Sequence, residues 1–197
     1  MDEIRTMRNS DADASARSLA DAFGDDPVMG WAGKFDDNRD RLVPLWRLVI
    51  NFRIGKSDPL LFTTEDNEAN AVWDAPGDTD IATIDLFKGL PSMLRSFRTG
   101  VPRLLRMLHA MDKAHPKEPH YYLLAIGVSH THQGKGLGSA VIQPMLDRCD
   151  QEGLPAYLEN TKPKNEAFYA RHGFERRGTL DLPAGCPSVM PMWRTPR

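Results

Sequence analysis

The sequence predicts an α/β or α+β fold, in which one β-sheet and several helices form a single domain spanning residues 1–197. Two observations carry this prediction. Short strand-like runs alternate along the chain with longer segments whose apolar residues recur every three or four positions, as on the buried face of a helix. The run at 121–128 is unbroken apolar sequence, as expected of a central strand covered on both faces.

The N-terminal part of the chain predicts one short strand, two helices and a long loop. Residues 4–8 are strand-like, and a helix follows with Ser10 as its N-cap and Gly24 at its end. Residues 25–40 are polar and rich in turn formers, so we expect a loop that folds over another part of the molecule. Its last residue, Asp40, marks the start of the next helix.

The rest of the chain alternates between the two kinds of element. We expect strands at 60–64, 69–74, 121–128, 155–160, 174–182 and 189–193, the first two as a hairpin, and helices within 81–113, at 136–152 and at 165–172. The helical region 81–113 should break near Gly100 and Pro102. Pro144 removes a backbone donor and should kink the helix that contains it.

The composition argues against several classes of protein. There are 25 Lys and Arg against 27 Asp and Glu, so the basic surface typical of nucleic-acid-binding proteins is missing. No apolar run approaches the roughly 20 residues of a membrane-spanning helix, and the acidic N-terminus is unlike a secretory signal. We therefore expect a cytoplasmic protein, monomeric or homodimeric, that binds neither membranes nor nucleic acid. In that compartment Cys149 and Cys186 should be reduced thiols.

The most informative segment is 133–138, Gln-Gly-Lys-Gly-Leu-Gly, which lies between an expected strand and an expected helix. Glycines let the backbone approach a ligand and adopt positive φ, and a helix N-terminus presents free N–H groups that favour an anion. This combination predicts a cradle for a pyrophosphate. The spacing fits neither the Walker loop nor the dinucleotide fingerprint, whose third glycine would fall on Ser139. A glycine-rich turn without a ligand is the alternative interpretation.

The order of a strand ending at Val128, four residues, Gln-x-x-Gly-x-Gly and a helix resembles the acetyl-coenzyme A (acetyl-CoA) site of the GCN5-related N-acetyltransferase (GNAT) family. The likeness extends to further segments that are similar to those of puromycin N-acetyltransferase and its relatives: His-Pro-Lys-Glu-Pro at 115–119, Leu-Glu-Asn at 158–160 and His-Gly-Phe at 172–174. It covers most of residues 115–182 closely and residues 1–114 loosely.

This resemblance implies a GNAT fold, with a mixed central sheet that splays at the acetyl-CoA-binding strand and helices on both faces. It implies a bulge in that strand, for which Gly127 is suited, and a Val128 N–H that polarises the thioester carbonyl. The residues it assigns to acetyl-CoA binding are Ile126, Gly127, Val128, Gln133, Gly134, Lys135, Gly136, Leu137, Gly138, Ser139 and Asn165.

Two catalytic residues are expected: Tyr169 from the resemblance, and Glu159 because attack on the thioester needs a neutral amine. Tyr169, one helical turn after Asn165, would protonate the departing thiolate, since a phenol keeps its proton at neutral pH. Glu159 would be the base that deprotonates an ammonium substrate, or the anion that docks it. A core aromatic and a structural carboxylate are the respective alternatives. Asn160 stands where the relatives usually have Thr, which bears on how Glu159 is oriented.

Phe23, Trp31 and Trp46 are expected to wall the acceptor pocket. We expect no metal site, because His130 and His132 lack a third ligand at zinc-like spacing. No Ser or Cys has the local setting of a nucleophile, which favours direct transfer in a ternary complex over an acyl-enzyme.

The expected function is therefore acetyl-CoA-dependent N-acetylation of a primary amine on a small molecule. An aminonucleoside antibiotic such as puromycin is one candidate acceptor, and acting on it would make the enzyme a resistance determinant. Two other functions stay open: transfer to a protein N-terminus or lysine, and binding of coenzyme A by a non-catalytic sensor module. Glu159 and Tyr169 argue against the sensor, which needs neither.

Overall fold

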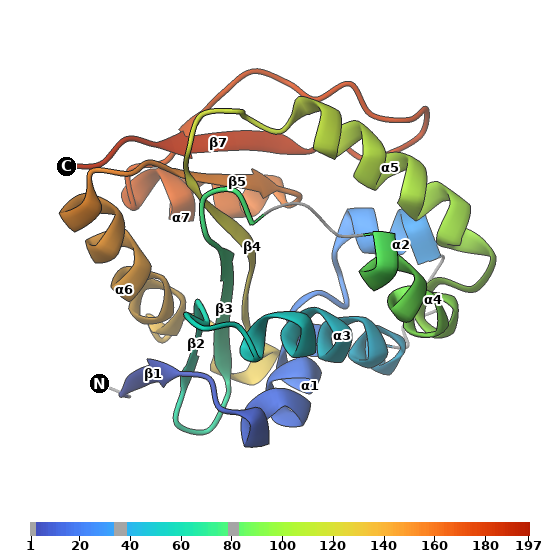
Figure 1. The fold of residues 1–197 in the computed structure, drawn as a ribbon, viewed down its shortest axis with the longest axis horizontal. Coiled ribbons are helices and arrows are strands. Elements are labelled where there is room, and N and C mark those ends of the chain that lie inside the picture. The colour runs from blue at the N-terminus through green and yellow to red at the C-terminus, as the bar shows by residue number, and fades with distance from the viewer. Residues whose placement is uncertain (1–2, 34–38, 79–82) are drawn as a thin grey trace.

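A computed structural model describes residues 3–33, 39–78 and 83–197 and contains a seven-stranded mixed sheet (Figure 1). The strands are β1 (Ile4–Thr6), β2 (Leu61–Thr64), β3 (Ala69–Asp74), β4 (Tyr121–Val128), β5 (Ala156–Asn160), β6 (Glu175–Arg176) and β7 (Met190–Arg194). They lie in the order β1-β2-β3-β4-β5-β7-β6. Neighbours are antiparallel except β4 and β5, which are parallel.

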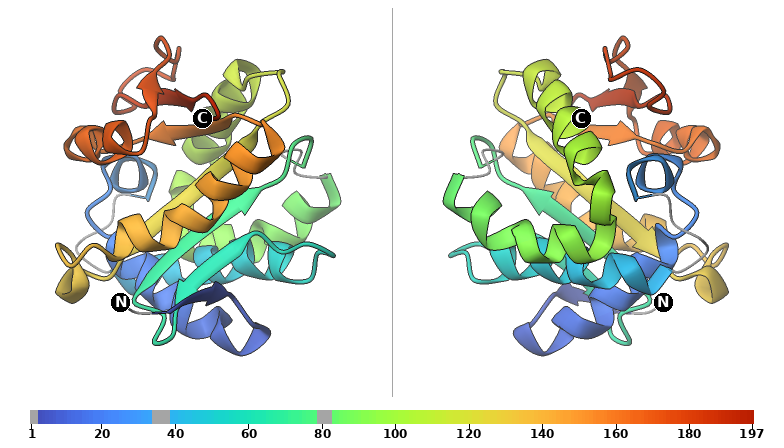
Figure 2. Two further views of the ribbon diagram at one scale, coloured as in Figure 1. Left: turned by 90° about the vertical axis from the view of Figure 1, so that its left-hand side faces the viewer. Right: turned by 90° about the vertical axis from the view of Figure 1, so that its right-hand side faces the viewer.

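Helices cover both faces of this sheet (Figures 1 and 2). They are α1 (Ala12–Ala22), α2 (Pro27–Gly33), α3 (Val43–Ile54), α4 (Thr83–Phe97), α5 (Val101–Ala114), α6 (Leu137–Glu152) and α7 (Glu166–Arg171), with 3-10 turns at Asn9–Asp11, Arg39–Leu42, Arg98–Gly100, His130–His132 and Pro163–Asn165. On one face α6 and α7 bury a core around Met145 and Phe174. On the other, α1, α3 and α5 bury a core around Leu19 and Leu104. This arrangement confirms the expected fold. No helix in the described ranges has both the length and the apolar character to cross a membrane.

The N-terminal elements differ from expectation in two places. Ser10 lies inside a 3-10 turn, and Asp11 is the N-cap residue of α1, without a side-chain capping bond to it. The Asp11 Oδ2 instead accepts the Arg8 N–H at 2.7 Å, at the start of the 3-10 turn. The expectation of a loop over residues 25–40 was wrong in part, since α2 occupies part of it; residues 34–38 lie outside the described ranges. The helix expected from Asp40 is confirmed, with a 3-10 turn leading into α3.

The later elements follow the sequence pattern with one clear exception. The hairpin of β2 and β3 and the division between α4 and α5 are confirmed, whereas residues 81 and 82 lie outside the described ranges. The strand expected at 174–182 is confirmed only at β6 and is wrong beyond it: the Arg177 N–H still donates to the Pro191 carbonyl at 2.8 Å, but no strand follows. Gly178 has a φ of +74°, and this left-handed residue turns the chain away from β7. Helix α6 continues through Pro144.

The bulge in β4 lies at Leu124 rather than at Gly127. Val72 pairs with Ala125 whereas Trp73 pairs with Leu123, so Leu124 is the extra residue, and Gly127 pairs regularly with Asn70. The bulge shifts the alternation of β4, so that Leu123 joins the core under α6 whereas Ala125 joins the core under α1. Leu123 and Ala125, which would share a face in a regular strand, thus lie on opposite faces of the sheet.

Gly127 instead allows α1 to approach the sheet. A Cβ at this position would lie 2.8 Å from Ala22 Cβ and 3.0 Å from Leu19 Cδ2. Because protein interiors are close-packed, that contact forces α1 to move.

Replacing Gly127 with alanine is expected to destabilise the protein by about 1–3 kcal/mol through overpacking. At this chain length the loss corresponds to a fall in Tm of about 2–12 °C. The matched control is Gly55→Ala, since a Cβ there meets no atom within 4 Å. Equal melting temperatures of the two variants, measured by circular dichroism, would contradict this role of Gly127.

Candidate active site

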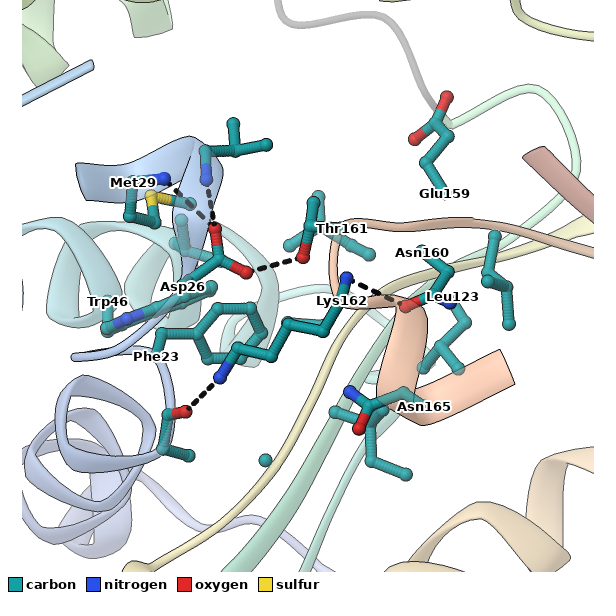
Figure 3. Close-up of a pocket in the computed structure, with 18 of the residues that line it drawn as sticks. Phe23, Asp26, Met29, Trp46, Leu123, Glu159, Asn160, Thr161, Lys162 and Asn165 are labelled. Carbon is teal, nitrogen blue, oxygen red and sulfur yellow. Dashed lines mark hydrogen bonds between the residues drawn. The ribbon is translucent and has the colours of Figure 1, made fainter. Parts of the chain in front are cut away.

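A pocket of about 700 Å³ lies where β4 and β5 separate, and it extends from the loop before α6 to helices α3 and α5 (Figure 3). The two strands pair only through residues 121–123 and 156–158. In the described chain, residues 124–128 pair with β3 alone, which leaves the β5-facing edge of this part of β4 open to the pocket. An open strand edge can bind an extended ligand that carries amide groups.

Two polar groups mark this open edge. The Gln133 side chain donates a hydrogen bond from Nε2 to the Val128 carbonyl at 3.1 Å, so the loop is tied to the end of β4. Asn160 on β5 is 2% exposed, and its Oδ1 accepts the Lys162 N–H at 3.1 Å. Its buried Nδ2 has no partner in the described chain. A buried amide donor without a partner is costly, so the pocket suits a ligand with an acceptor near this position.

The glycine-rich loop forms one end of the pocket. Gly134 and Gly136 have φ of +79° and +84°, and a Cβ at either would meet no atom within 4 Å. These glycines are therefore needed for the left-handed backbone conformation and not for close packing. The space beside the loop stays open. Residues 137–139 line the pocket and lie in the first turn of the 16-residue helix α6, where unpaired N–H groups favour an anion.

The expected cofactor residues lie around this end, with one exception. Those that line the pocket are Ile126, Gly127, Val128, Gln133, Gly134, Gly136, Leu137, Gly138, Ser139 and Asn165. Lys135 is exposed and does not line it. A Cβ at Gly138 would make an ordinary contact with Phe168 of α7, at 3.4 Å, so α6 and α7 lie close together here.

Helix α7 directs Asn165 and Tyr169 into the same pocket. Asn165 occupies the N-cap of α7 without a side-chain capping bond, so within the described residues its amide is available to a ligand in the pocket. Tyr169 is 8% exposed, and its hydroxyl has no hydrogen-bond partner in the described chain. Burial, followed by the negative charge of Asp26, raises the pKa of Tyr169, so the phenol stays protonated.

The carboxylate of Glu159 lies in the pocket wall and its side chain is 3% exposed. Glu159 and Asn160 leave β5 on opposite sides (Figure 3). Tyr122 donates to Glu159 Oε2 at 2.5 Å and Tyr157 donates to Oε1 at 3.1 Å. Burial, followed by the charge of Glu159, raises the pKa of both phenols, so they remain donors. Each carboxylate oxygen keeps a second lone pair for a ligand.

The far end of the pocket is mainly apolar. Phe23 and Trp46 both line it, with ring centroids 4.6 Å apart. Further apolar residues complete this wall: Met29, Val49, Met93, Leu104, Met107, Leu108 and Met111. Trp31 does not line the pocket; its Nε1 lies 3.7 Å from where a Cβ of Gly185 would be.

Asp26 is a pocket residue that the sequence analysis missed. It is 2% exposed, and its Oδ1 accepts the N–H groups of Val28 and Met29 at 2.9 Å each, which caps α2. Its Oδ2 accepts the hydroxyl proton of Thr161, which lies 135 positions away in the sequence (Figure 3). The Asp-Pro dipeptide at 26–27 is a signal for the cap. No sequence pattern indicates the bond to Thr161.

A second pair of residues joins the same two segments. Lys162 donates from Nζ to Asp25. It also donates to the Ala22 carbonyl at 3.0 Å (Figure 3). Burial opposes the ionisation of Asp25, but hydrogen bonds from Lys162 and Lys164 outweigh it and lower the pKa of Asp25 to about 2. The end of α1 is thereby tied to the chain after β5, across the pocket.

His130 and His132 lie in the turn before the glycine-rich loop. The His130 N–H donates to Asp21 Oδ2 at 2.7 Å, and Ser129 Oγ lies 2.9 Å from His132 Nδ1. In the described part of the chain, no three His, Cys, Asp or Glu side chains are grouped so as to hold a metal ion.

Comparison with known proteins agrees with this geometry. Residues 102–174, from α5 to the segment after α7, match the model of the acetyltransferase (GNAT) family. An uncharacterised N-acetyltransferase of Schizosaccharomyces pombe is 27% identical over 190 residues, which cover 90% of this chain and 76% of that protein.

Solved structures share the fold over almost the whole chain. A Corynebacterium glutamicum structure described as histone acetyltransferase HPA2 and related acetyltransferase has a TM-score of 0.72 and 24% identity, covering 100% of this chain and 98% of the other. Arylalkylamine N-acetyltransferase 2 of Aedes aegypti has a TM-score of 0.69 and 12% identity, covering 99% of both chains. At these identities the likeness establishes the fold.

Proposed function

We propose that this chain is an acetyl-CoA-dependent N-acetyltransferase of the GNAT type and that its acceptor is a primary amine on a small, largely apolar molecule. The match of residues 102–174 to the family model and the similar S. pombe N-acetyltransferase support the first part. The observation that carries the proposal is the pocket, which runs from the anion site at α6 past Glu159 to an apolar end between helices. Its volume of about 700 Å³ falls within the range of small-molecule sites.

The residues present fit acetyl-CoA. Gly134 and Gly136 hold the loop open, and the N–H groups at the start of α6 suit a pyrophosphate. The open edge of β4 and the free amide of Asn165 suit the amide groups of a pantetheine arm, and the unpartnered Asn160 Nδ2 adds a donor near that edge. Acetyl-CoA supplies the acetyl group as a thioester, whose carbonyl would be polarised by the N–H of Val128.

The charges around the far end suit a cationic acceptor. Arg53 lines the pocket, but its guanidinium is paired with Asp74 at 2.7 and 2.8 Å, and Lys162 is paired with Asp25. Glu159 therefore faces the pocket as a carboxylate whose Lys and Arg neighbours are committed elsewhere. An ammonium group would find a hydrogen-bond acceptor there.

Two residues carry the proposed chemistry. Glu159 accepts a proton from the ammonium, which leaves the nitrogen lone pair free to form the C–N bond with the acetyl carbonyl carbon. As the C–S bond breaks, the Tyr169 hydroxyl gives its proton to the leaving sulfur. The second proton that the nitrogen loses on becoming an amide then restores the Tyr169 hydroxyl. Both side chains line the same pocket, so the reaction needs no acyl-enzyme.

Aromatic alkylamines and aminonucleosides such as puromycin are the proposed acceptor classes. The far end is lined by Phe23, Trp46 and several methionines, which suit an aromatic or apolar body beside the amine. The Aedes aegypti neighbour is named for arylalkylamines, which agrees with this lining.

The test is release of coenzyme A thiol from acetyl-CoA in the presence of an amine panel, with mass spectrometry of the products. The panel holds an arylalkylamine, puromycin, a polyamine, a lysine-containing peptide and a peptide with a free N-terminus. We expect the apolar small amines to give the highest kcat/KM. Their N,N-dimethylated counterparts should give no acetylated product, because the neutral nitrogen carries no hydrogen that an acetyl group can replace. Preference for a peptide would replace the proposed substrate class, and no release above the amine-free rate with any acceptor would contradict the function.

A further inference from the structure

A pair of histidines lies behind Glu159 and is not used by the chemistry above. His115 and His120 belong to the His-Pro-Lys-Glu-Pro-His segment between α5 and β4. His115 Nδ1 is 3.9 Å from Glu159 Oε1, and His115 Nε2 is 3.0 Å from His120 Nε2. His120 Nδ1 in turn lies 2.6 Å from the Glu118 carbonyl oxygen. Three titratable side chains therefore form a row that starts in the pocket wall.

The hydrogen bonds determine where the protons sit in this row. A carbonyl oxygen only accepts, so His120 Nδ1 must carry the hydrogen that binds Glu118. Burial lowers the pKa of His120, which keeps the ring neutral and leaves a lone pair on its Nε2. His115 must then donate from its own Nε2. In neutral His115 this leaves Nδ1 without a hydrogen, facing Glu159.

Glu159 offers no hydrogen to that nitrogen either. Its two oxygens accept the hydroxyl protons of Tyr122 and Tyr157, as described above. The rings that pack around His115 are His120, Tyr122 and Tyr157, at centroid distances of 4.9, 4.9 and 5.1 Å. In the described chain, two lone pairs thus face each other 3.9 Å apart. This is about 1 Å longer than a hydrogen bond, so the proton passes when the two side chains approach by that amount in the substrate complex.

We propose that His115 receives the proton that Glu159 removes from the acceptor ammonium, and that His120 is the positioning residue that keeps His115 Nδ1 free to do so. This inference rests on the proposed function. Glu159 lines the pocket whereas His115 does not, so the proton reaches His115 through the carboxylate.

The transfer balances without another reactant. The ammonium N–H bond breaks and its electron pair stays on nitrogen for attack on the acetyl carbon. The proton bonds first to Glu159 and then to His115 Nδ1, which becomes an imidazolium beside the restored carboxylate. The His115 side chain is 15% exposed against 3% for Glu159, so it can pass the proton to solvent before the next turnover.

The experiment compares the pH dependence of His115→Phe with that of the unchanged protein, using the best amine of the panel. Phenylalanine keeps an aromatic ring against Tyr122 and Tyr157 but cannot take a proton. We expect kcat/KM to fall about 10-fold or more near neutral pH, a modest part of the usual effect of general base catalysis. The deficit should shrink as the pH approaches the amine pKa of about 10, because the acceptor then arrives already neutral.

A second variant and two controls separate this role from a structural one. His115→Ala should regain rate when free imidazole is added, whereas His109→Ala, an exposed change on the preceding helix α5, should behave like the unchanged protein. Calorimetry should give the same acetyl-CoA affinity for all of them.

The outcomes distinguish the two proposals. A deficit in His115→Phe that is equal at every pH, or full activity of this variant, would overturn the role of His115 while the proposed function stands. No turnover by the unchanged protein with any amine would remove the proposed function and this inference with it.

Discussion

Replacing Tyr169 with phenylalanine is expected to lower kcat by about 10²-fold, the lower end of the usual contribution of general acid–base catalysis. The variant removes the hydroxyl and keeps the ring that packs against Phe168 and Phe174. Because burial and Asp26 raise the pKa of this phenol, the hydroxyl holds its proton at neutral pH and can donate to the leaving sulfur. Its loss should affect the chemical step and not the binding of acetyl-CoA.

Steady-state kinetics together with calorimetry checks this result. Tyr121→Phe is the matched control, since that hydroxyl donates to Glu152 at 2.6 Å and the residue does not line the pocket. It should retain the kcat of the unchanged protein. If Tyr169→Phe also kept its kcat, or if its acetyl-CoA affinity fell in step with the rate, the general-acid role would be wrong.

Replacing Glu159 with glutamine is expected to reduce kcat/KM for a cationic amine by about 10²-fold or more. Glutamine keeps the shape of the side chain, but it carries no charge to attract an ammonium and cannot accept its proton. The size of the loss reflects the pocket geometry, in which Arg53 and Lys162 are already paired and Glu159 is 3% exposed. Water has little access to such a buried position, so it does not take over from the carboxylate as the proton acceptor.

The way the loss divides between kinetic parameters identifies the role of Glu159. A base lowers kcat, whereas an anion that only docks the amine raises KM and leaves kcat unchanged. Glu175→Gln, an exposed change on β6, serves as the control and should match the unchanged protein. Unaltered kcat and KM in Glu159→Gln would show that this carboxylate is structural.

The part of the site that could be predicted from the sequence is the part encoded by short segments. Gly134 and Gly136 precede a helix within a few residues, and positive φ and a helix N-terminus are local properties. Asn165 and Tyr169 are one helical turn apart, so a helix places both on one face. These residues do line one pocket.

The acceptor end could not be predicted in the same way. Trp31 was expected in its wall because the segment was expected to be a loop, but α2 forms there under the cap of Asp26, and Trp31 lies beside Gly185. The bulge was expected at Gly127, but strand register places it at Leu124. Both outcomes depend on partners distant in the sequence.

The sequence by itself determined most of the helices and strands and the glycine-rich loop before α6, because side-chain periodicity, capping and backbone φ act over a few residues. It missed α2 and predicted too long a strand at 174–182. The tertiary structure alone decided that Glu159 lies against Tyr122 and close to His115, and that Asp26 meets Thr161. Those contacts follow from which strand pairs with which and from where β4 and β5 part. Strand pairing, and the point where β4 and β5 separate, are set by the packing of the whole sheet against its helices. Such packing cannot be predicted from a local sequence pattern.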